Sequence, residues 1–185
     1  MVKLSNAPLI VLEGDEYLSS PIDLRPKFHL YKPHIALLSG VAWDHINVFP
    51  TFKNYVEQFE IFADSIEPKG SLIYYEGDEN LVDVSKRVTG EKKAIPYGAL
   101  NHKIDGGKTT VFFEGEEYEM NIFGEHNLQN MNGAMLVLKE IGVEPKDFLR
   151  SIQSFTGASK RLEIVKESTQ SILFKDFAHS PSKLK

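Results

Sequence analysis

The sequence predicts an α/β fold: a mostly parallel open sheet flanked by helices, with a small antiparallel hairpin sheet inserted into it. Short apolar runs end in polar residues, which is typical of strands buried on both faces. Segments with helical spacing alternate with these runs, as in an α/β layer fold. Two segments with alternating apolar residues, joined by a short loop, interrupt this order and predict the hairpin. With 185 residues, 42% of them hydrophobic, the chain is long enough to bury a core.

The first two strands are predicted at residues 9–12 and 35–38, which are short and wholly apolar. Carboxylates follow the first run, beginning with Glu13, and Asp44 and His45 lie a few residues after the second. Open parallel sheets bind ligands beyond the carboxyl ends of their strands. Glu13 and His45 are therefore candidates for one site, although a solvated Glu13 and a His45 that caps or packs against a helix explain the same residues without a ligand.

A helix is predicted between residues 51 and 67, because apolar side chains recur there at three- and four-residue spacing. Thr51 suits the start of this helix as a cap, and Pro68 follows its end. A strand at 71–75 and a helix near 79–88 continue the alternation. The first half of the chain thus predicts strand–helix units of a parallel sheet.

The hairpin is predicted at residues 109–113 and 118–122, with an acidic, glycine-containing loop between them. Helices are predicted next, near 127–141 and 145–153, and Pro145 suits a first helical turn. The hairpin therefore separates the strand–helix units from a mainly helical stretch.

Beyond Gly157 the pattern changes to two predicted strands, at 161–166 and 172–175. Two strands do not form a stable domain alone. We therefore predict a domain boundary near Gly157, with residues 1–156 forming one domain and residues 157–185 beginning another.

The net charge of −5, from 21 basic and 26 acidic residues, makes nucleic acid and anionic membrane unexpected partners. The chain has no cysteine, which excludes disulfides and leaves only His and carboxylates for a zinc site. Its start lacks the apolar stretch of a signal peptide, and no segment approaches the ~20 apolar residues of a membrane helix. We expect a soluble, cytoplasmic protein.

A run of Gly107, Lys108 and Thr109 imitates the end of a phosphate-binding loop, GxxxxGK[ST]. His102 stands where that loop requires its first glycine. The run also enters the predicted hairpin, rather than a helix whose N-terminal amides would hold phosphate. We interpret it as a plain turn.

Three further residues are candidates for ligand binding. Asn130 lies one turn inside a predicted helix, where capping explains it poorly, and its amide could hydrogen-bond a ligand. Arg161 follows a glycine-containing hinge and could bind phosphate through two nitrogens, and Asp176 follows the last predicted strand. Solvated surface is the alternative for Arg161 and Asp176.

Five segments, in this order and spacing, together resemble the Mur ligase family over nearly the whole chain. They are VLEGDEY at 11–17, DH at 44–45, GEHN at 124–127 with Asn130, FTGASKRLE at 155–163 and DFAHSP at 176–181. Each segment is weak alone, whereas the ordered set is specific. Details around Tyr17, Lys27 and Asn47 resemble the branch of UDP-N-acetylmuramate–L-alanine ligases and muropeptide ligases, and the latter more closely.

The resemblance implies a three-domain enzyme that uses ATP and Mg²⁺ to join an amino acid or peptide to UDP-N-acetylmuramate through an acyl phosphate. The chain would hold most of the central ATPase domain, entered after its P-loop strand and helix, and the start of the C-terminal domain. Alone it would be inactive. By position, the resemblance implies Mg²⁺ association for Glu13 and His45, and contacts to adenine, phosphate and ribose for Asn130, Arg161 and Asp176, respectively.

The sequence departs from the family pattern at several places. Ser39 and Gly40 replace a segment that usually carries asparagine, Lys160 replaces a usual arginine, and Ser180 replaces a frequent second histidine. Glu60 or a neighbour stands where several members carry a carbamylated lysine, so this modification is not expected. Two alternatives stay open: a stand-alone nucleotide-binding module without catalysis, and a folylpolyglutamate-synthase-like ligase, which fits the context of Tyr17 less well. The acceptor amine and the oligomeric state are left undetermined.

Overall fold

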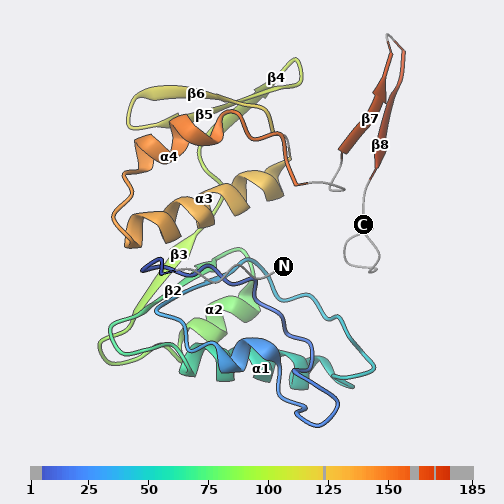
Figure 1. Ribbon diagram of the computed structural model, residues 1–185. Coiled ribbons are helices and arrows are strands. Elements are labelled where there is room, and N and C mark those ends of the chain that lie inside the picture. The colour runs from blue at the N-terminus through green and yellow to red at the C-terminus, as the bar shows by residue number, and fades with distance from the viewer. Residues whose placement is uncertain (1–5, 123, 159–162, 169, 176–185) are drawn as a thin grey trace.

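The computed structural model describes residues 6–122, 124–158, 163–168 and 170–175. Figure 1 shows that most of these residues form a layered α/β structure, with helices on both faces of a parallel sheet and a second, antiparallel sheet beyond one helical layer. The predicted fold class is therefore confirmed. No helix within the described ranges is both long enough and apolar enough to cross a bilayer.

The parallel sheet has the strand order β1-β2-β3. Its strands are β1 (Ile35–Leu38), β2 (Ser71–Tyr75) and β3 (Lys93–Tyr97). The strands predicted at 35–38 and 71–75 are confirmed. Strand β3 is absent from the sequence prediction because Lys93 and Pro96 obscure its apolar pattern.

One face of this sheet is covered by α1 (Phe52–Asp64) and α2 (Glu79–Ser85), as Figure 1 shows. Thr51 caps α1 as predicted, because its hydroxyl accepts a hydrogen bond of 3.1 Å from the backbone N–H of Asn54. Apolar residues of both helices form one buried cluster with the sheet, and its fully buried members include Leu72, Leu81 and Val84.

The opposite face is covered by α3 (Glu125–Glu140), which lies close to the sheet at Gly133. A Cβ atom there would come within 2.9 Å of Leu37 Cδ1 and 3.1 Å of Tyr97 Cζ. Such contacts are too short for an unshifted side chain, so glycine permits this separation of helix and sheet.

The second sheet is antiparallel and has the order β4-β5-β6. Its strands are β4 (His102–Asp105), β5 (Lys108–Phe113) and β6 (Glu116–Met120). The predicted hairpin is confirmed as β5–β6, while β4 is an additional strand that its single apolar residue, Ile104, does not reveal. Helix α4 (Pro145–Ile152) packs with α3 beneath this sheet, around buried residues that include Val111, Leu128 and Leu149.

The glycines of the phosphate-loop imitation form the tight turn between β4 and β5. Gly106 and Gly107 have φ angles of 55° and 81°, and Asp105 pairs with Lys108 across the turn. Positive φ at both central residues suits glycine and matches the twist of a hairpin. The interpretation of this run as a plain turn is confirmed.

The strand predicted at residues 9–12 is wrong. This run is irregular, and its side chains are exposed, with 94% of Val11 accessible. A strand requires hydrogen-bonded neighbours, and in the described part of the chain no backbone hydrogen bond joins 9–12 to the sheet. The apolar pattern alone therefore gave the wrong secondary structure.

Strands β7 (Glu163–Glu167) and β8 (Ile172–Lys175) form a hairpin that stands apart from the layered part in Figure 1. Both were expected, at 161–166 and 172–175, and residues 161 and 162 lie outside the described residues. Apolar residues of the hairpin are exposed, including Val165, Leu173 and Phe174.

Glu140, at the end of α3, is expected to stabilise the fold. The buried hydroxyl of Ser71 donates a hydrogen bond of 2.6 Å to Glu140 Oε2, and Lys93 Nζ lies 3.5 Å from the same oxygen. Glu140→Ala leaves the Ser71 hydroxyl buried without this acceptor, which should lower the free energy of unfolding by ~1–3 kcal/mol. Urea unfolding measures the loss. The double variant with Ser71→Ala should lose less than the sum of the two single variants, and strict additivity would contradict this coupling.

Candidate functional site

Residues 13–17 follow the irregular N-terminal run and are anchored by polar contacts to the short 3-10 helix η1 (Lys27–Leu30). Lys27 Nζ lies 2.6 Å from Asp15 Oδ2, and the backbone N–H of Lys27 donates to the carbonyl oxygen of Tyr17. The other carboxylate oxygen of Asp15 accepts from the N–H of Tyr17 at 2.8 Å. Partial burial opposes ionisation of Asp15, but these hydrogen bonds outweigh it and lower its pKa. Glu16 is thus held between two anchored residues.

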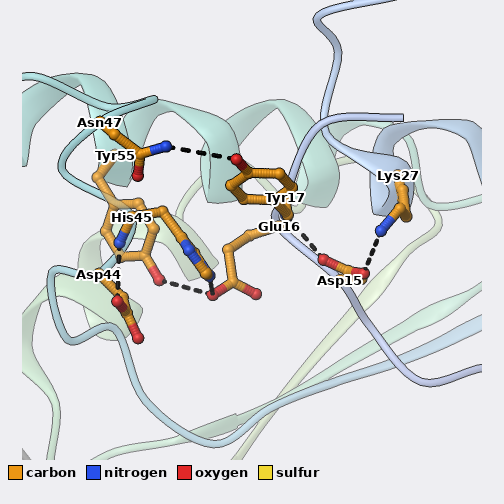
Figure 2. Close-up of polar contacts among 8 residues, drawn as sticks. All are labelled: Asp15, Glu16, Tyr17, Lys27, Asp44, His45, Asn47 and Tyr55. Carbon is orange, nitrogen blue, oxygen red and sulfur yellow. Dashed lines mark hydrogen bonds and ion pairs between the residues drawn. The ribbon is translucent and has the colours of Figure 1, made fainter. Parts of the chain in front are cut away.

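His45 lies in the loop after β1 and has a φ of 53°, a left-handed conformation that is uncommon outside glycine. Its backbone N–H donates to Asp44 Oδ1 at 2.8 Å. Its Nε2 lies 3.4 Å from Glu16 Oε1, and the ring of Tyr17 packs edge-on against the imidazole at a centroid distance of 4.9 Å (Figure 2). The two segments predicted to lie at one edge of the sheet therefore meet through Glu16 and His45.

Tyr55 joins this group from α1. Its hydroxyl donates to Glu16 Oε1 at 3.3 Å, so one carboxylate oxygen faces both Tyr55 and His45 (Figure 2). Burial, together with the nearby Glu16 carboxylate, raises the pKa of Tyr55. The phenol therefore stays protonated at neutral pH and remains a hydrogen-bond donor.

Two hollows flank this group. The first has a volume of about 300 Å³ and is lined by Glu13, Gly14, Asp15, Glu16 and Tyr31. The second has a volume of about 420 Å³ and is lined by Leu18, Leu24, Asn47, Val48, Phe49, Asn54 and Gln58. Asn47 connects the second hollow to the group, because its amide donates to the Tyr17 hydroxyl at 3.3 Å. Glu16 lines the first hollow together with Glu13.

The loop after β1 is also tied to the start of α2. Asp78 caps α2 by accepting from the N–H of Asn80 at 2.9 Å, and its second oxygen accepts from the N–H of Val41 at 2.6 Å. One carboxylate thus connects the segments that follow β1 and β2, at the carboxyl edge of the parallel sheet.

Asn130 is exposed in the first half of α3. Its neighbours attach this part of α3 to the same edge of the sheet: Gln129 donates to the Tyr75 hydroxyl at 3.0 Å, and Asn132 donates to the carbonyl oxygen of Gly98 at 2.8 Å. Arg161 and Asp176 lie outside the described residues. The arrangement of the three nucleotide candidates therefore remains a prediction.

The donor set suits a magnesium ion shared with a nucleotide better than a cation enclosed by protein. Within the described ranges, no group of three or more His, Asp or Glu side chains could hold a metal. Magnesium in phosphate-transfer sites is commonly held by one or two protein ligands, together with phosphate oxygens and water. Glu13, which lines the first hollow, supplies a carboxylate suited to such a partial set, whereas the part of His45 in it remains a prediction.

Residue Glu16 was not among the predicted site residues, although it lies at the centre of the contacts. The acidic run that begins at Glu13 was the available signal. The link to Tyr55, 39 positions away, needs the folded chain.

Comparison with known proteins gives the relationship. Residues 9–138 match the family described as the Mur ligase middle domain. The UDP-N-acetylmuramate--L-alanyl-gamma-D-glutamyl-meso-2,6-diaminoheptandioate ligase of Escherichia coli (strain K12) is 29% identical, and the match covers 97% of this chain and 41% of that protein. The UDP-N-acetylmuramate--L-alanine ligase of Syntrophomonas wolfei is 27% identical, with 99% of this chain and 41% of the relative covered.

Solved structures show the same fold. A murein peptide ligase from Psychrobacter arcticus aligns with a TM-score of 0.68 and 24% identity, covering 92% of this chain and 37% of the other. MurF from Acinetobacter baumannii aligns with a TM-score of 0.72 and 17% identity, covering 85% of this chain and 37% of the other. The chain spans about two fifths of the length of the curated relatives. Since the family match covers most of its residues, the chain belongs to the Mur ligase family through the middle domain.

Proposed function

We propose that this chain is the central part of a cytoplasmic, ATP-dependent ligase that joins an amino acid or peptide to UDP-N-acetylmuramate. The observation that carries the proposal is the match of residues 9–138 to the Mur ligase middle domain. Relatives named as ligases of UDP-N-acetylmuramate support this substrate, and their acceptors are L-alanine or a diaminoheptandioate-containing peptide. UDP-sugars and ATP are cytoplasmic metabolites, which supports the location.

The proposed reaction places ATP and a substrate carboxylate beyond the carboxyl edge of the parallel sheet. Glu13 and His45 would hold a magnesium ion, which supplies neutralisation of charge on phosphate oxygens. Asn130 would hydrogen-bond the adenine, and Arg161 and Asp176 would contact phosphate and ribose. The substrate carboxylate would attack the γ-phosphorus of ATP, forming an acyl phosphate and releasing ADP. The amine of the second substrate would then attack the acyl carbon, forming the amide and releasing phosphate and a proton.

We further propose that residues 1–156 belong to the central domain and residues 157–185 begin the C-terminal domain. The separate position of the β7–β8 hairpin in Figure 1 supports this division. A hinge at Gly157, whose φ is 102°, suits a junction between domains that move relative to each other.

Ligation by the complete protein tests the proposal. Incubation with UDP-N-acetylmuramate, ATP and Mg²⁺ plus either L-alanine or L-alanyl-γ-D-glutamyl-meso-diaminoheptanedioate should give an amide product, detected by mass spectrometry. A folate substrate with glutamate serves as the second arm, because solved structures of similar fold include a Lactobacillus casei folylpolyglutamate synthase. Product in that arm alone would favour the folylpolyglutamate-synthase-like alternative. ATP binding without any product would favour a binding module.

A further inference from the structure

We propose that Glu16 is a positioning residue that fixes the orientation of the His45 imidazole. This inference rests on the proposed function for its importance, because His45 is proposed there to hold magnesium. It differs from the proposed role of Glu13, which would touch the metal, since Glu16 acts through His45.

One carboxylate oxygen of Glu16 contacts both His45 and Tyr55. Oε1 lies 3.4 Å from His45 Nε2 and accepts from the Tyr55 hydroxyl at 3.3 Å. Figure 2 shows the imidazole beside the Tyr17 ring, with Nε2 directed at this carboxylate. The ring is thus bounded on one side by an aromatic edge and at Nε2 by a negative charge.

Glu16 is restrained both through its backbone neighbour Asp15 and at its carboxylate. Asp15 is paired with Lys27, and the backbone carbonyl of Asp15 accepts from the N–H of Phe28 at 3.1 Å. Tyr55 is 3% exposed on a helix within the core, so its hydroxyl is a fixed donor. A carboxylate held from its backbone and from its tip can orient a third group, whereas a freely rotating surface carboxylate contributes little.

The backbone of His45 also adopts a left-handed conformation. A φ of 53° in a residue with a β-carbon is strained, and such conformations persist where surrounding contacts determine them. The carbonyl oxygen of His45 accepts hydrogen bonds from the N–H groups of Val48 and Phe49 at 2.8 and 2.9 Å, and these hold its backbone. Its side chain is held by Glu16 and Tyr17. Both side chains of this contact are also partly shielded, with 34% of His45 and 27% of Glu16 exposed.

The test uses nuclear Overhauser effects between the His45 and Tyr17 rings, measured by NMR on this chain. Wild type should show them because the rings lie 4.9 Å apart. Glu16→Ala should lose them. Glu16→Gln should retain them, because its amide oxygen reaches as far and still accepts from Tyr55. Tyr55→Phe, which keeps the buried ring, should weaken them. Asp23→Asn, which breaks an exposed carboxylate pair with Arg25 in the same segment, is the matched control and should change nothing.

A second measurement relates orientation to the metal. Mn²⁺ alone, a paramagnetic substitute for Mg²⁺, should broaden the His45 resonances of the wild type. The concentration for half-broadening should rise ~10–100-fold in Glu16→Ala, the scale for losing a residue that orients a ligand, and far less in Glu16→Gln.

Retention of the nuclear Overhauser effects between the His45 and Tyr17 rings in Glu16→Ala would overturn the inference. If Glu16→Ala does not fold, unchanged effects in Tyr55→Phe would overturn it instead, because Glu16 would then need no fixed donor. Absence of Mn²⁺ broadening in the wild type would count against the magnesium role of His45, and so against the proposed function. The nuclear Overhauser effects between the two rings would still test whether Glu16 orients His45.

Discussion

His45→Ala is expected to lower the turnover of the complete ligase by ~10²–10³-fold, the scale for removing one group that stabilises developing charge. The imidazole is proposed to help hold magnesium next to the phosphate oxygens, and alanine offers no donor atom. Because His45 lies outside both buried apolar clusters, its loss should cost less packing than the loss of a core residue, and the melting temperature should stay close to that of the wild type. Steady-state kinetics over a range of Mg²⁺ concentrations measure the effect.

His34→Ala is the matched control for that experiment. His34 is exposed and precedes β1, at the opposite end of the strand from the His45 loop. Its removal should leave turnover and the Mg²⁺ requirement unchanged. Near-normal activity of His45→Ala at limiting Mg²⁺ would show that the assignment of His45 is wrong.

This chain on its own is expected to release no phosphate from ATP above the buffer rate. A phosphate-binding loop surrounds the phosphates with backbone N–H groups and adds a lysine. The sequence contains no GxxxxGK[ST] segment, and its nearest imitation is the hairpin turn at Gly106 and Gly107. Without that ring of donors, the alignment that drives phosphoryl transfer is lost.

Calorimetry with ATP and Mg²⁺, alongside a phosphate-release assay on the pure chain, measures this expectation. The complete ligase, assayed in parallel with both of its substrates, is the positive control. Micromolar binding together with steady phosphate release from the chain alone would defeat the proposal that it is one part of a ligase, and would indicate an independent ATPase.

Local pattern predicted the elements whose burial is simple. Strands β1 and β2 are buried on both faces, so their sequences are apolar, and the spacing in α1 matches one buried stripe. The expectation that a short apolar run forms a buried strand failed at residues 9–12, because such a run forms a strand only when a neighbouring strand hydrogen-bonds to it. It also missed β3 and β4, whose exposed lysines mask pairing that the neighbouring strands impose.

The candidate site was predictable only in part. The carboxylates after residue 12 and the Asp44–His45 pair marked the two segments that meet. The contact between Glu16 and Tyr55 was not predictable, because Tyr55 belongs to the apolar stripe of α1 and carries no sign of its polar partner. A buried tyrosine such as Tyr55 is therefore easily missed as a site residue, because its apolar ring explains its position and its hydroxyl contact is visible only in the fold.

Helix α3 has a consequence for how the domain comes apart. Its Gly133 face touches the parallel sheet, while Leu128, Met131 and Met135 belong to the buried cluster under the antiparallel sheet. A helix shared by two cores cannot leave one without opening the other. We therefore expect the two sheets to unfold as one cooperative unit, with hydrogen exchange at the central amides of both sheets reporting the same global opening.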